Sequence, residues 1–404
     1  YNPPAKTYTI HDLGTLPGYA NSIAKAVSND GSTVVGWNYN DGGTHGHAFI
    51  YNKNGMKDIG TLGGNFSIAT GVSFDGSVVV GLSTTSNGTE HAFYYKNGIM
   101  HNIGSMDTTH SNADSWSRAK GISADGRYIV GQSDTNQAGI THAFKFDTYT
   151  EKFTDLGSIG GPESIATATN LDGSVVVGFG KTINPGELHA LVFRDNKIID
   201  LETTDLNHKC SLATSISDDG KIISGISFNV VGNLVGYDWV TYKMVDIVSF
   251  KANLNSLGQY TVEKFDLDKS NLGAVDLASY GSMIAGGYWS NNSTQAFIYD
   301  NLHFVDLNFP DNSFKSSCAL GVNLNGNVVV GGISKDNSAD FTSTIDHKAN
   351  GTHAVIWTAD NTTAQANLFV QATAALSGSS VSGNVASSGP LQDKQSIIIS
   401  PKPV

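Results

Sequence analysis

Residues 73–81 read SFDGSVVVG and residues 170–178 read NLDGSVVVG, so the chain repeats nine nearly identical residues 97 positions apart. A regular internal repeat is the sequence signature of solenoids, propellers and arrays. Alignment on the glycine of this Asp-Gly element, which is Asp-Gly in the first five copies, finds seven copies, each with an alanine seven residues before that glycine and a second glycine five residues after it. The alanines are Ala24, Ala69, Ala119, Ala166, Ala213, Ala274 and Ala319. The first glycines are Gly31, Gly76, Gly126, Gly173, Gly220, Gly281 and Gly326, and the second are Gly36, Gly81, Gly131, Gly178, Gly225, Gly286 and Gly331.

Each copy holds four strand-like pieces. Two of them flank the Asp-Gly turn, a third opens with an apolar triplet, and a fourth ends in a motif such as Asp-Leu-Gly. The third pieces begin at His47, His91, His142, His189, Gly236, Gln295 and His353. A period of 45–50 residues with four strands has the size of a propeller blade. The sequence therefore predicts an all-β fold, a seven-bladed β-propeller with a C-terminal extension.

The order of the pieces predicts how the propeller is assembled. The alanine-containing piece is expected to be the innermost strand, where blades crowd and only a small side chain fits. The Asp-Gly pair is expected to form a tight hairpin in which both residues tolerate positive φ. The last copy has no outer strand of its own, whereas the chain begins with one, YTIHDLG at 8–14. We therefore expect the N-terminal strand to close the last blade and remove a free sheet edge.

The composition changes after Trp357. Residues 1–357 are predicted to form the propeller, and residues 358–404 a Ser/Gly/Ala-rich extension or linker. The short apolar run QSIIIS at 395–400 could pair with a sheet edge, so self-assembly through residues 377–404 is one possibility. The other possibility is that this extension tethers the propeller to a C-terminal anchor or barrel.

Charge and cysteine content exclude several classes of protein. The chain has 24 Lys and Arg against 36 Asp and Glu, a formal charge of −12, which argues against a nucleic-acid partner. No apolar run reaches the roughly 18 residues of a transmembrane helix. Cys210 and Cys318 are too few for a disulfide framework or a zinc site, and whether they pair is left open.

The His-Ala-Phe triplets at 47–49, 91–93 and 142–144, flanked by Asp-Leu-Gly and DGSVVVG motifs, resemble the HAF repeat of bacterial extracellular repeat proteins. The resemblance covers roughly residues 8–357. It implies a secreted or cell-surface bacterial protein, sometimes the passenger of an autotransporter, and it implies no established chemistry. Copies five and six have Gly236 and Gln295 where the histidine is expected, so no role needing a complete ring of histidines is predicted.

The candidate binding site is the face that carries the variable loops. One side of the propeller has short, repetitive turns, whereas the loops between second and third strands and between blades vary in length. Function on a rigid scaffold is expected in such loops. The segment 249–272 is predicted to be one of these loops, and it supplies Tyr260, Glu263, Asp266 and Asp268. The mixture of aromatic rings, acids and amides suits carbohydrate. The candidate ligand-binding residues are Trp37, Tyr39, Asp41, His45, Asp107, His110, Asp114, Trp116, Trp289, Asp340, Asp346 and His347.

The recurrent histidines are interpreted as structural. Histidines on separate blades lie too far apart to share one metal ion, so we expect each to bond to a neighbouring turn or blade. Calcium is possible because several loops hold spaced Asp and Asn, although none matches the twelve-residue calcium loop; no other cofactor is expected. The repeat residues to which we assign a structural role are Ala24, Gly31, Gly36, His47, Ala69, Gly76, Gly81, His91, Gly126, His142, Gly173, His189 and His353.

These patterns favour a secreted or cell-surface binding or adhesion module that recognises a glycan, or a protein on a host or neighbouring cell. Two alternatives stay open: an extracellular polysaccharide-acting hydrolase or lyase using facing carboxylates, and a structural subunit assembled through its tail. No GxSxG, HExxH, phosphate-loop or CxxC motif is present, so catalysis has less support.

Overall fold

A computed structural model describes residues 5–40, 45–109, 115–201, 208–231, 243–264, 272–277, 283–290, 293–300, 302–307, 309, 312–336 and 351–360. Contacts within the chain divide it into two units, residues 1–370 and 371–404, and all described residues belong to the first. Every regular element in the described ranges is a β-strand, which confirms the predicted all-β fold.

The strands fall into repeats of four along the chain. The first two repeats hold β2 (Asn21–Val27), β3 (Val34–Tyr39), β4 (Gly46–Asn52), β5 (Gly55–Asp58), β6 (Gly63–Val72), β7 (Val78–Thr85), β8 (Glu90–Lys96) and β9 (Ile99–Gly104). The third and fourth hold β10 (Ser117–Ile122), β11 (Tyr128–Asp134), β12 (Thr141–Asp147), β13 (Lys152–Gly157), β14 (Ser164–Thr169), β15 (Val175–Lys181), β16 (Leu188–Arg194) and β17 (Lys197–Asp200). The fifth and sixth hold β18 (Cys210–Ile216), β19 (Ile222–Val231), β20 (Lys243–Leu254), β21 (Tyr260–Lys264), β22 (Leu272–Leu277), β23 (Ile284–Ser290), β24 (Ser293–Tyr299) and β25 (Phe304–Asp306). The last comprises β26 (Ser316–Val322), β27 (Val328–Ser334), β28 (Thr352–Ala359) and, from the start of the chain, β1 (Tyr8–Gly14).

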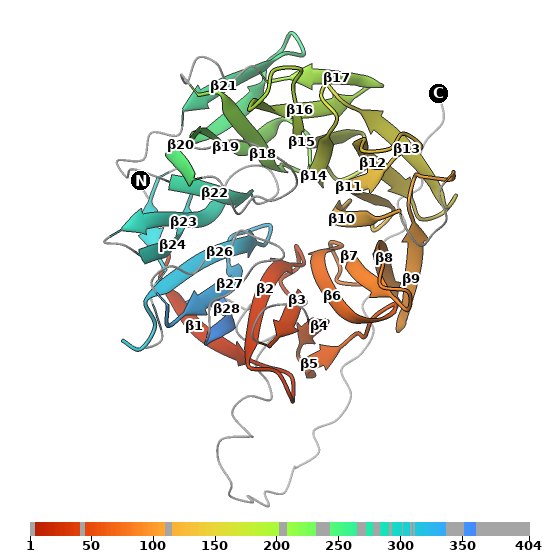
Figure 1. The fold of residues 1–404 in the computed structure, drawn as a ribbon. Helices are drawn as coiled ribbons and strands as arrows, with labels where there is room; N and C mark the ends of the chain where they lie inside the picture. Colours follow the sequence, from red (N-terminus) through yellow and green to blue (C-terminus); the bar gives the residue numbers. More distant parts are fainter. Residues whose placement is uncertain are drawn as a thin grey trace, which may run out of the picture. The chain divides into compact units, whose positions relative to one another are not determined.

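Antiparallel pairing joins the described strands into seven groups of four. The N-terminal strand β1 pairs with β28, from Tyr8 opposite Ala359 to Gly14 opposite Ala354, as the sequence predicts. The first strands of successive repeats contact one another in order, β2 with β6, β6 with β10, β10 with β14, β14 with β18, β18 with β22, β22 with β26 and β26 with β2. These strands lie nearest the centre of the arrangement in Figure 1. The N-terminal strand therefore completes the last sheet, and the first strands of the last and first repeats are in contact.

Close backbone approach explains the repeated alanine and second glycine. Ala24 in β2 pairs with Gly36 in β3, and a Cβ added to Gly36 would lie 2.0 Å from the carbonyl oxygen of Ile23. In five further repeats, a Cβ added to the second glycine would lie 1.9–2.3 Å from the carbonyl oxygen of the residue before the repeated alanine. A β-bulge follows the alanine in every repeat. Only glycine fits beside a strand that is bent in this way.

The Asp-Gly turn differs from the predicted two-residue hairpin. Gly31 has a φ of +75°, whereas Asp30 is not among the residues with positive φ. The turn spans six residues, with the Ser28 amide donating to the Thr33 carbonyl at 2.8 Å. Asp30 acts through its carboxylate, which accepts hydrogen bonds from the Ser28 hydroxyl at 2.6 Å and the Ser32 amide at 2.9 Å. The prediction of a tight hairpin that uses positive φ at both Asp and Gly was therefore wrong for Asp30, which stabilises the turn through its side chain.

The fifth repeat also differs from the prediction. Gly225 pairs with Phe250 in β20, the place that Phe49 takes opposite Gly36 in the first repeat. Residues 248–250, and not a segment starting at Gly236, therefore take the position of the His-Ala-Phe triplet. Gly236 itself lies outside the described residues. The predicted loop 249–272 contains the end of β20, all of β21 and the first residue of β22, so much of its described part is strand.

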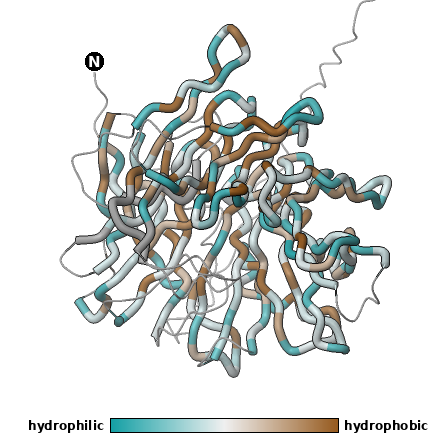
Figure 2. The backbone as a smooth tube through the Cα atoms, turned by 45° about the horizontal axis from the view of Figure 1, so that its top comes forward, coloured by the Kyte–Doolittle hydropathy of each residue, from teal (hydrophilic) through white to brown (hydrophobic). Residues whose placement is uncertain are grey.

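The core lies between neighbouring sheets. One cluster combines Ala24, Val34 and Phe49 of the first repeat with Val330 and Ile356 of the last, all with no exposed surface. Apolar residues follow the strands, whereas most loop tips at the rim are hydrophilic (Figure 2). Burial of both faces of each sheet explains why strands such as VVVG are apolar throughout.

The recurrent histidines bond within their own sheet. His47 Nδ1 lies 2.7 Å from Asp58 Oδ2 on the adjacent outer strand, and the other carboxylate oxygen of Asp58 accepts the Gly60 amide at 2.7 Å. The equivalent pairs are His91 with Asn102, His142 with Asp155, His189 with Asp200, and His353 with Asp12 of the N-terminal strand. The expected partner was a neighbouring turn or blade, whereas these bonds go to the outer strand of the same sheet; the His91 ring also reaches the next repeat, with Nε2 3.2 Å from the Ser115 carbonyl oxygen. The fifth repeat has Val248 and Lys264 at these two positions, so histidine and acid are lost together.

In six of the seven repeats a serine joins the sheet to the one before it, whereas the sixth repeat has Leu272 at this position. The Ser67 hydroxyl accepts the Ala48 amide at 2.9 Å and donates to the Gly60 carbonyl at 2.6 Å, and both partners belong to the first repeat. Ser22, Ser117 and Ser164 make the same pair of bonds, and Ser211 and Ser317 accept the same amide. This inter-sheet serine fixes the spacing between neighbouring repeats.

Candidate functional site

Two of the predicted ligand-binding aromatics belong to the core. Trp37 and Tyr39 are 0% and 1% exposed, and their rings stack with centroids 4.4 Å apart. Burial raises the pKa of the Tyr39 hydroxyl to about 12. Neither side chain offers a surface to a ligand, contrary to the expectation, because both point inward from β3 against Phe66 and Leu82 of the second repeat.

The remaining predicted residues are distributed unevenly. His45 is exposed, and Asp107 is buried, where its carboxylate accepts the amide and hydroxyl of Thr109 at 2.8 and 2.9 Å. Trp289 lies in β23, with its backbone opposite Thr294. The residues that lie outside the described ranges are Asp41, His110, Asp114, Asp340, Asp346 and His347, together with Asp266 and Asp268.

The third repeat is polar where other repeats are apolar. In each repeat, the residue just before the repeated alanine, in the first strand, pairs with the residue just after the second glycine, in the second strand. In four repeats these two positions hold apolar pairs, which are Ile23 with Trp37, Ile68 with Leu82, Ile165 with Phe179, and Leu212 with Ile226. In the third repeat they hold Arg118 and Gln132. The same backbone therefore carries a different chemistry at this one place.

Arg118 and Gln132 belong to a polar cluster that we define as Glu90, Arg118, Gln132, Glu163 and Lys181. Arg118 bonds to Glu90 of the second repeat at 2.6–2.7 Å, and Lys181 bonds to Glu163 at 2.6 Å. The Gln132 amide donates to Glu163 at 3.1 Å and to the Thr141 hydroxyl at 2.9 Å. Gln132 and Glu163 are buried. The side chains of Arg118, Glu90 and Lys181 are each about a quarter exposed.

The polar cluster lies on the side of the variable loops. Glu90 begins β8 and Lys181 ends β15, and both strand ends lead into loops between second and third strands. Trp116, a predicted ligand-binding residue, lies against the cluster with the Arg118 guanidinium 4.9 Å from its ring centroid. Its amide donates to Asp134 Oδ2 at 3.0 Å, which fixes the backbone that leads into β10. Of the predicted residues that lie in the described ranges, Trp116 is the one beside this cluster.

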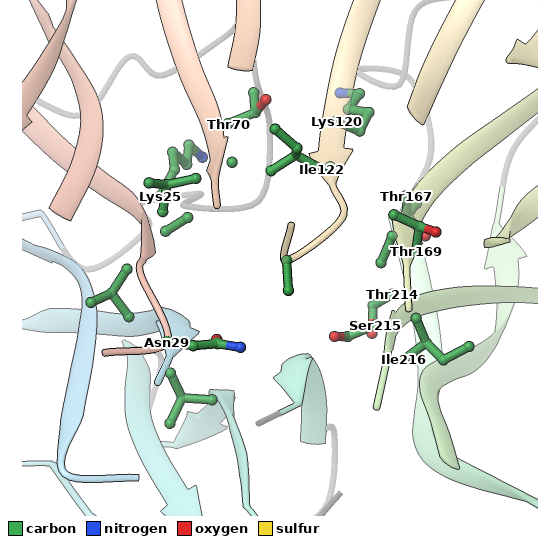
Figure 3. A pocket seen from close by; sticks show the side chains of 18 of the residues that line it. Lys25, Asn29, Thr70, Lys120, Ile122, Thr167, Thr169, Thr214, Ser215 and Ile216 are labelled. Atoms are coloured by element: carbon green, nitrogen blue, oxygen red, sulfur yellow. The ribbon is translucent and has the colours of Figure 1, made fainter. Parts of the chain in front are cut away.

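A cavity of about 230 Å³ lies on the inner side of the first strands. Figure 3 shows Lys25 of β2 and Lys120 of β10 on either side of Thr70 of β6. Thr167 and Thr214 line the cavity in the fourth and fifth repeats. Burial, then the nearby charges of Arg118 and Lys25, lower the pKa of the Lys120 ammonium to about 8.

The described ranges give no support for a calcium site or for a disulfide between the two cysteines. They contain no group of three or more His, Cys, Asp or Glu side chains placed to hold an ion, so calcium stays a prediction. Cys210 and Cys318 are buried in different repeats and form no disulfide. Within the described part of the chain, no helix is long and apolar enough to cross a membrane.

The polar cluster is suited to recognition. Its two carboxylates are bound to cations, so they present fixed acceptors beside the fixed donors of Arg118 and Gln132. Arg118, Glu90 and Lys181 are partly exposed at the loop side, where Arg118 contacts the Trp116 ring, whereas Gln132 and Glu163 are buried. The signal that could have revealed Arg118 and Gln132 is in the sequence, because alignment of the seven repeats shows them at otherwise apolar positions.

Comparison with known proteins defines the class of fold. No family model matches the sequence, and no curated protein matches it. Among solved structures, oligogalacturonate lyase in complex with manganese aligns at a TM-score of 0.52 and 10% identity, covering 89% of this chain and 96% of that one. The β-propeller domain of the Trilobed protease from Pyrococcus furiosus, described as having an open velcro topology, aligns at 0.51 and 12% identity, covering 86% and 95%. TolB from Acinetobacter baumannii aligns at 0.40 and 13% identity, over 71% of this chain and only 63% of its own length.

These likenesses show that the chain is a β-propeller. At such low identity they show the fold alone, and the resemblance to HAF-repeat proteins receives no support from them.

Proposed function

We propose that this propeller is an exported binding module that recognises a glycan, or a polar surface on another cell, through the polar cluster and the loops around it. The observation that carries the proposal is the replacement of an apolar core pair by Arg118 and Gln132 in the third repeat. Removing charged and amide groups from water is unfavourable unless each finds a partner. The other repeats show that the fold has an apolar solution at the same positions, so stability does not account for the polar one.

The chemistry of the cluster supports a ligand with many hydroxyl groups. Guanidinium, amide and carboxylate groups at fixed positions can exchange donors and acceptors with sugar hydroxyls. Trp116 beside Arg118 adds apolar surface at the same place. The proposed location, secreted or at a bacterial surface, rests on the resemblance of the triplets to HAF repeats.

The test is a glycan array and a panel of host and neighbouring cells, probed with the parent chain and two matched variants. Arg118→Ile breaks the ion pair to Glu90, whereas Arg127→Ile breaks an equivalent ion pair to Asp147 in a turn on the opposite side of the sheet. We expect Arg118→Ile to weaken binding at least about tenfold, since charged hydrogen bonds contribute about 1.5–3 kcal/mol. Arg127→Ile should bind like the parent. Absence of any glycan or cell that binds the parent would sink the proposal.

A second candidate is an extracellular polysaccharide-acting hydrolase or lyase. It is favoured by Glu90 and Glu163, two carboxylates on either side of the third repeat, and by the fold-level likeness to oligogalacturonate lyase. The test follows new reducing ends and the ultraviolet absorbance of unsaturated products from neutral and acidic polysaccharides. Cleavage that disappears in Glu90→Gln and Glu163→Gln supports an enzyme, whereas cleavage of none of them excludes it.

A further inference from the structure

The polar cluster contains its own anion for Arg118. The Nε and Nη2 atoms of Arg118 lie 2.7 and 2.6 Å from Oε2 of Glu90. Glu90 belongs to the second repeat and Arg118 to the third, and about a quarter of each side chain is exposed. The guanidinium group that a glycan would meet at the loop side is therefore already bound to a carboxylate that the fold supplies.

This ion pair leaves particular groups for a ligand. An arginine side chain has five N–H donors, and the two bonds from Arg118 both go to one oxygen of Glu90. Oε1 of Glu90 takes no part in the pair. A sugar hydroxyl can accept from a remaining N–H of Arg118 and donate to this Oε1, because a hydroxyl is both donor and acceptor. An ionised carboxylate can only accept, and the charge of Glu90 repels it.

A ligand carboxylate could replace Glu90 only at a cost. Glu90 begins β8 and is held beside Arg118 by the packing of β8 against β10. A tethered carboxylate competes with a free one at an effective concentration of about millimolar. Its displacement would also leave a partly buried carboxylate without its cation, which is unfavourable. A neutral hydroxyl needs no displacement, since it adds to the pair as it stands.

The second ion pair of the cluster is closed in the same way. Lys181 bonds to Oε2 of Glu163 at 2.6 Å, and Oε1 of Glu163 accepts the Gln132 amide at 3.1 Å. Both oxygens of this carboxylate are therefore in use, and the side chain of Glu163 is only 8% exposed. Lys181, like Arg118, meets a ligand with its charge already compensated.

The surroundings of the cluster are acidic. The loop-side ends of the same three repeats add the carboxylates of Asp107, Asp134 and Glu187, and Lys209 adds an ammonium group where the fifth repeat begins. Negative charge therefore predominates where a ligand approaches, which disfavours an anionic one.

We propose that Glu90 determines the class of sugar that the polar cluster accepts. By occupying Arg118 it restricts the site to uncharged glycans, whose hydroxyls bridge Arg118 and Glu90, and it excludes acidic glycans that carry carboxylate or sulfate groups. This specificity rests on the proposed glycan-binding function and adds the class of ligand to it.

The first experiment probes the full chain with an array of neutral, uronate-containing, sialylated and sulfated glycans. We expect the glycans that bind to be neutral. The neutral oligosaccharide that binds best and the same oligosaccharide oxidised at C6 to a uronate then form a matched pair. Titration calorimetry with the parent chain is expected to show at least tenfold weaker binding of the uronate.

Glu90→Gln tests the role of the carboxylate, because it keeps the size of the side chain and removes the charge. It releases Arg118 for an external carboxylate, so we expect it to bind the uronate more tightly than the parent does. The ratio of the affinities for the neutral sugar and its uronate should fall at least about tenfold. Asp147→Asn is the matched control, since it removes the partner of Arg127 in a turn on the opposite side of the sheet and should change neither affinity.

The outcomes separate this inference from the proposed function. Acidic glycans that bind the parent more tightly than their neutral counterparts overturn the inference and leave a glycan-binding site in place. A Glu90→Gln chain that folds, as thermal unfolding checks, and gains no affinity for the uronate also overturns it. If this variant does not fold, the matched pair with the parent decides. If nothing on the array binds, the proposed function fails and the inference fails with it.

Discussion

The inter-sheet serine shows how one small side chain can hold two repeats at a fixed spacing. Ser67 belongs to β6, yet both of its hydrogen-bond partners, the Ala48 amide and the Gly60 carbonyl, lie in the preceding repeat. The hydrogen bond to the Ala48 amide is buried, and the one to the Gly60 carbonyl is partly buried. Loss of the hydroxyl therefore leaves a donor and an acceptor without partners.

Ser67→Ala is expected to lower the free energy of unfolding by about 1–3 kcal/mol, the penalty for buried groups left without a hydrogen bond. Ser86→Ala, at an exposed loop position, should change it by less than about 0.5 kcal/mol. Urea denaturation followed by circular dichroism measures both. Equal values for the two variants would show that the inter-sheet bond adds nothing to stability.

At the level of single residues, the sequence predicts which positions are repeated better than it predicts what each side chain contacts. The spacing of alanine and glycine can be seen in the sequence. Its physical reason is that a Cβ on the second glycine would lie 1.9–2.3 Å from a carbonyl oxygen of the first strand. Trp37 looks like a surface aromatic because it precedes a variable loop. It is buried because β3 is covered on both faces, a consequence of ring packing that no local pattern contains.

At the level of elements, the fifth repeat shows why the prediction of its third strand from the sequence motif was wrong. Its histidine and its outer-strand acid are both replaced, by Val248 and Lys264, so neither signal marks the strand. The register is kept: Gly225 pairs with Phe250, and a Cβ added to Gly225 would lie 2.3 Å from the Leu212 carbonyl oxygen and 2.4 Å from the Phe250 ring. The geometry of the repeat is thus kept where its sequence signature is lost.

The N-terminal strand is the element whose removal should matter most. β1 supplies Asp12, the partner of His353 at 2.5 Å, and it covers the edge of β28. Deletion of residues 1–14 is expected to lower the melting temperature by about 5–10 °C, since a strand that contributes several kcal/mol is lost. It should also increase association through the exposed edge.

Calorimetry and light scattering measure the two effects. A deletion of residues 1–4 leaves β1 in place and provides the control. An unchanged melting temperature in the longer deletion would mean that β1 contributes nothing to the stability of the last sheet.

At the scale of the whole molecule, the repeats are alike in backbone and unlike in chemistry. The polar cluster connects the second, third and fourth repeats, whereas equivalent positions between the last, first and second repeats form an apolar cluster around Trp37. A nearly symmetric scaffold therefore carries an asymmetric site. The sequence predicts the symmetry from its period, and the asymmetry appears only when the repeats are compared position by position.

The tail makes a further prediction at this scale. The sheet edge of β28 is covered by β1, so a chain ending at residue 376 is expected to be a monomer in light scattering. A full chain larger than this truncation would make residues 377–404 an assembly element and favour a structural subunit. Two monomers would make the tail a linker, and an oligomeric truncation would contradict the prediction.

The pairing of β1 with β28 also bears on how the protein is made. Tyr8 and Ala359 are joined in one sheet although some 350 residues separate them. During synthesis the first strand leaves the ribosome early, but its partner is available only after the last repeat has been translated. The intermediate repeats can pair locally in the meantime, because their strands are neighbours in sequence. The strand that is synthesised first is thus the one that takes its place last, and until then a growing chain carries an open sheet edge.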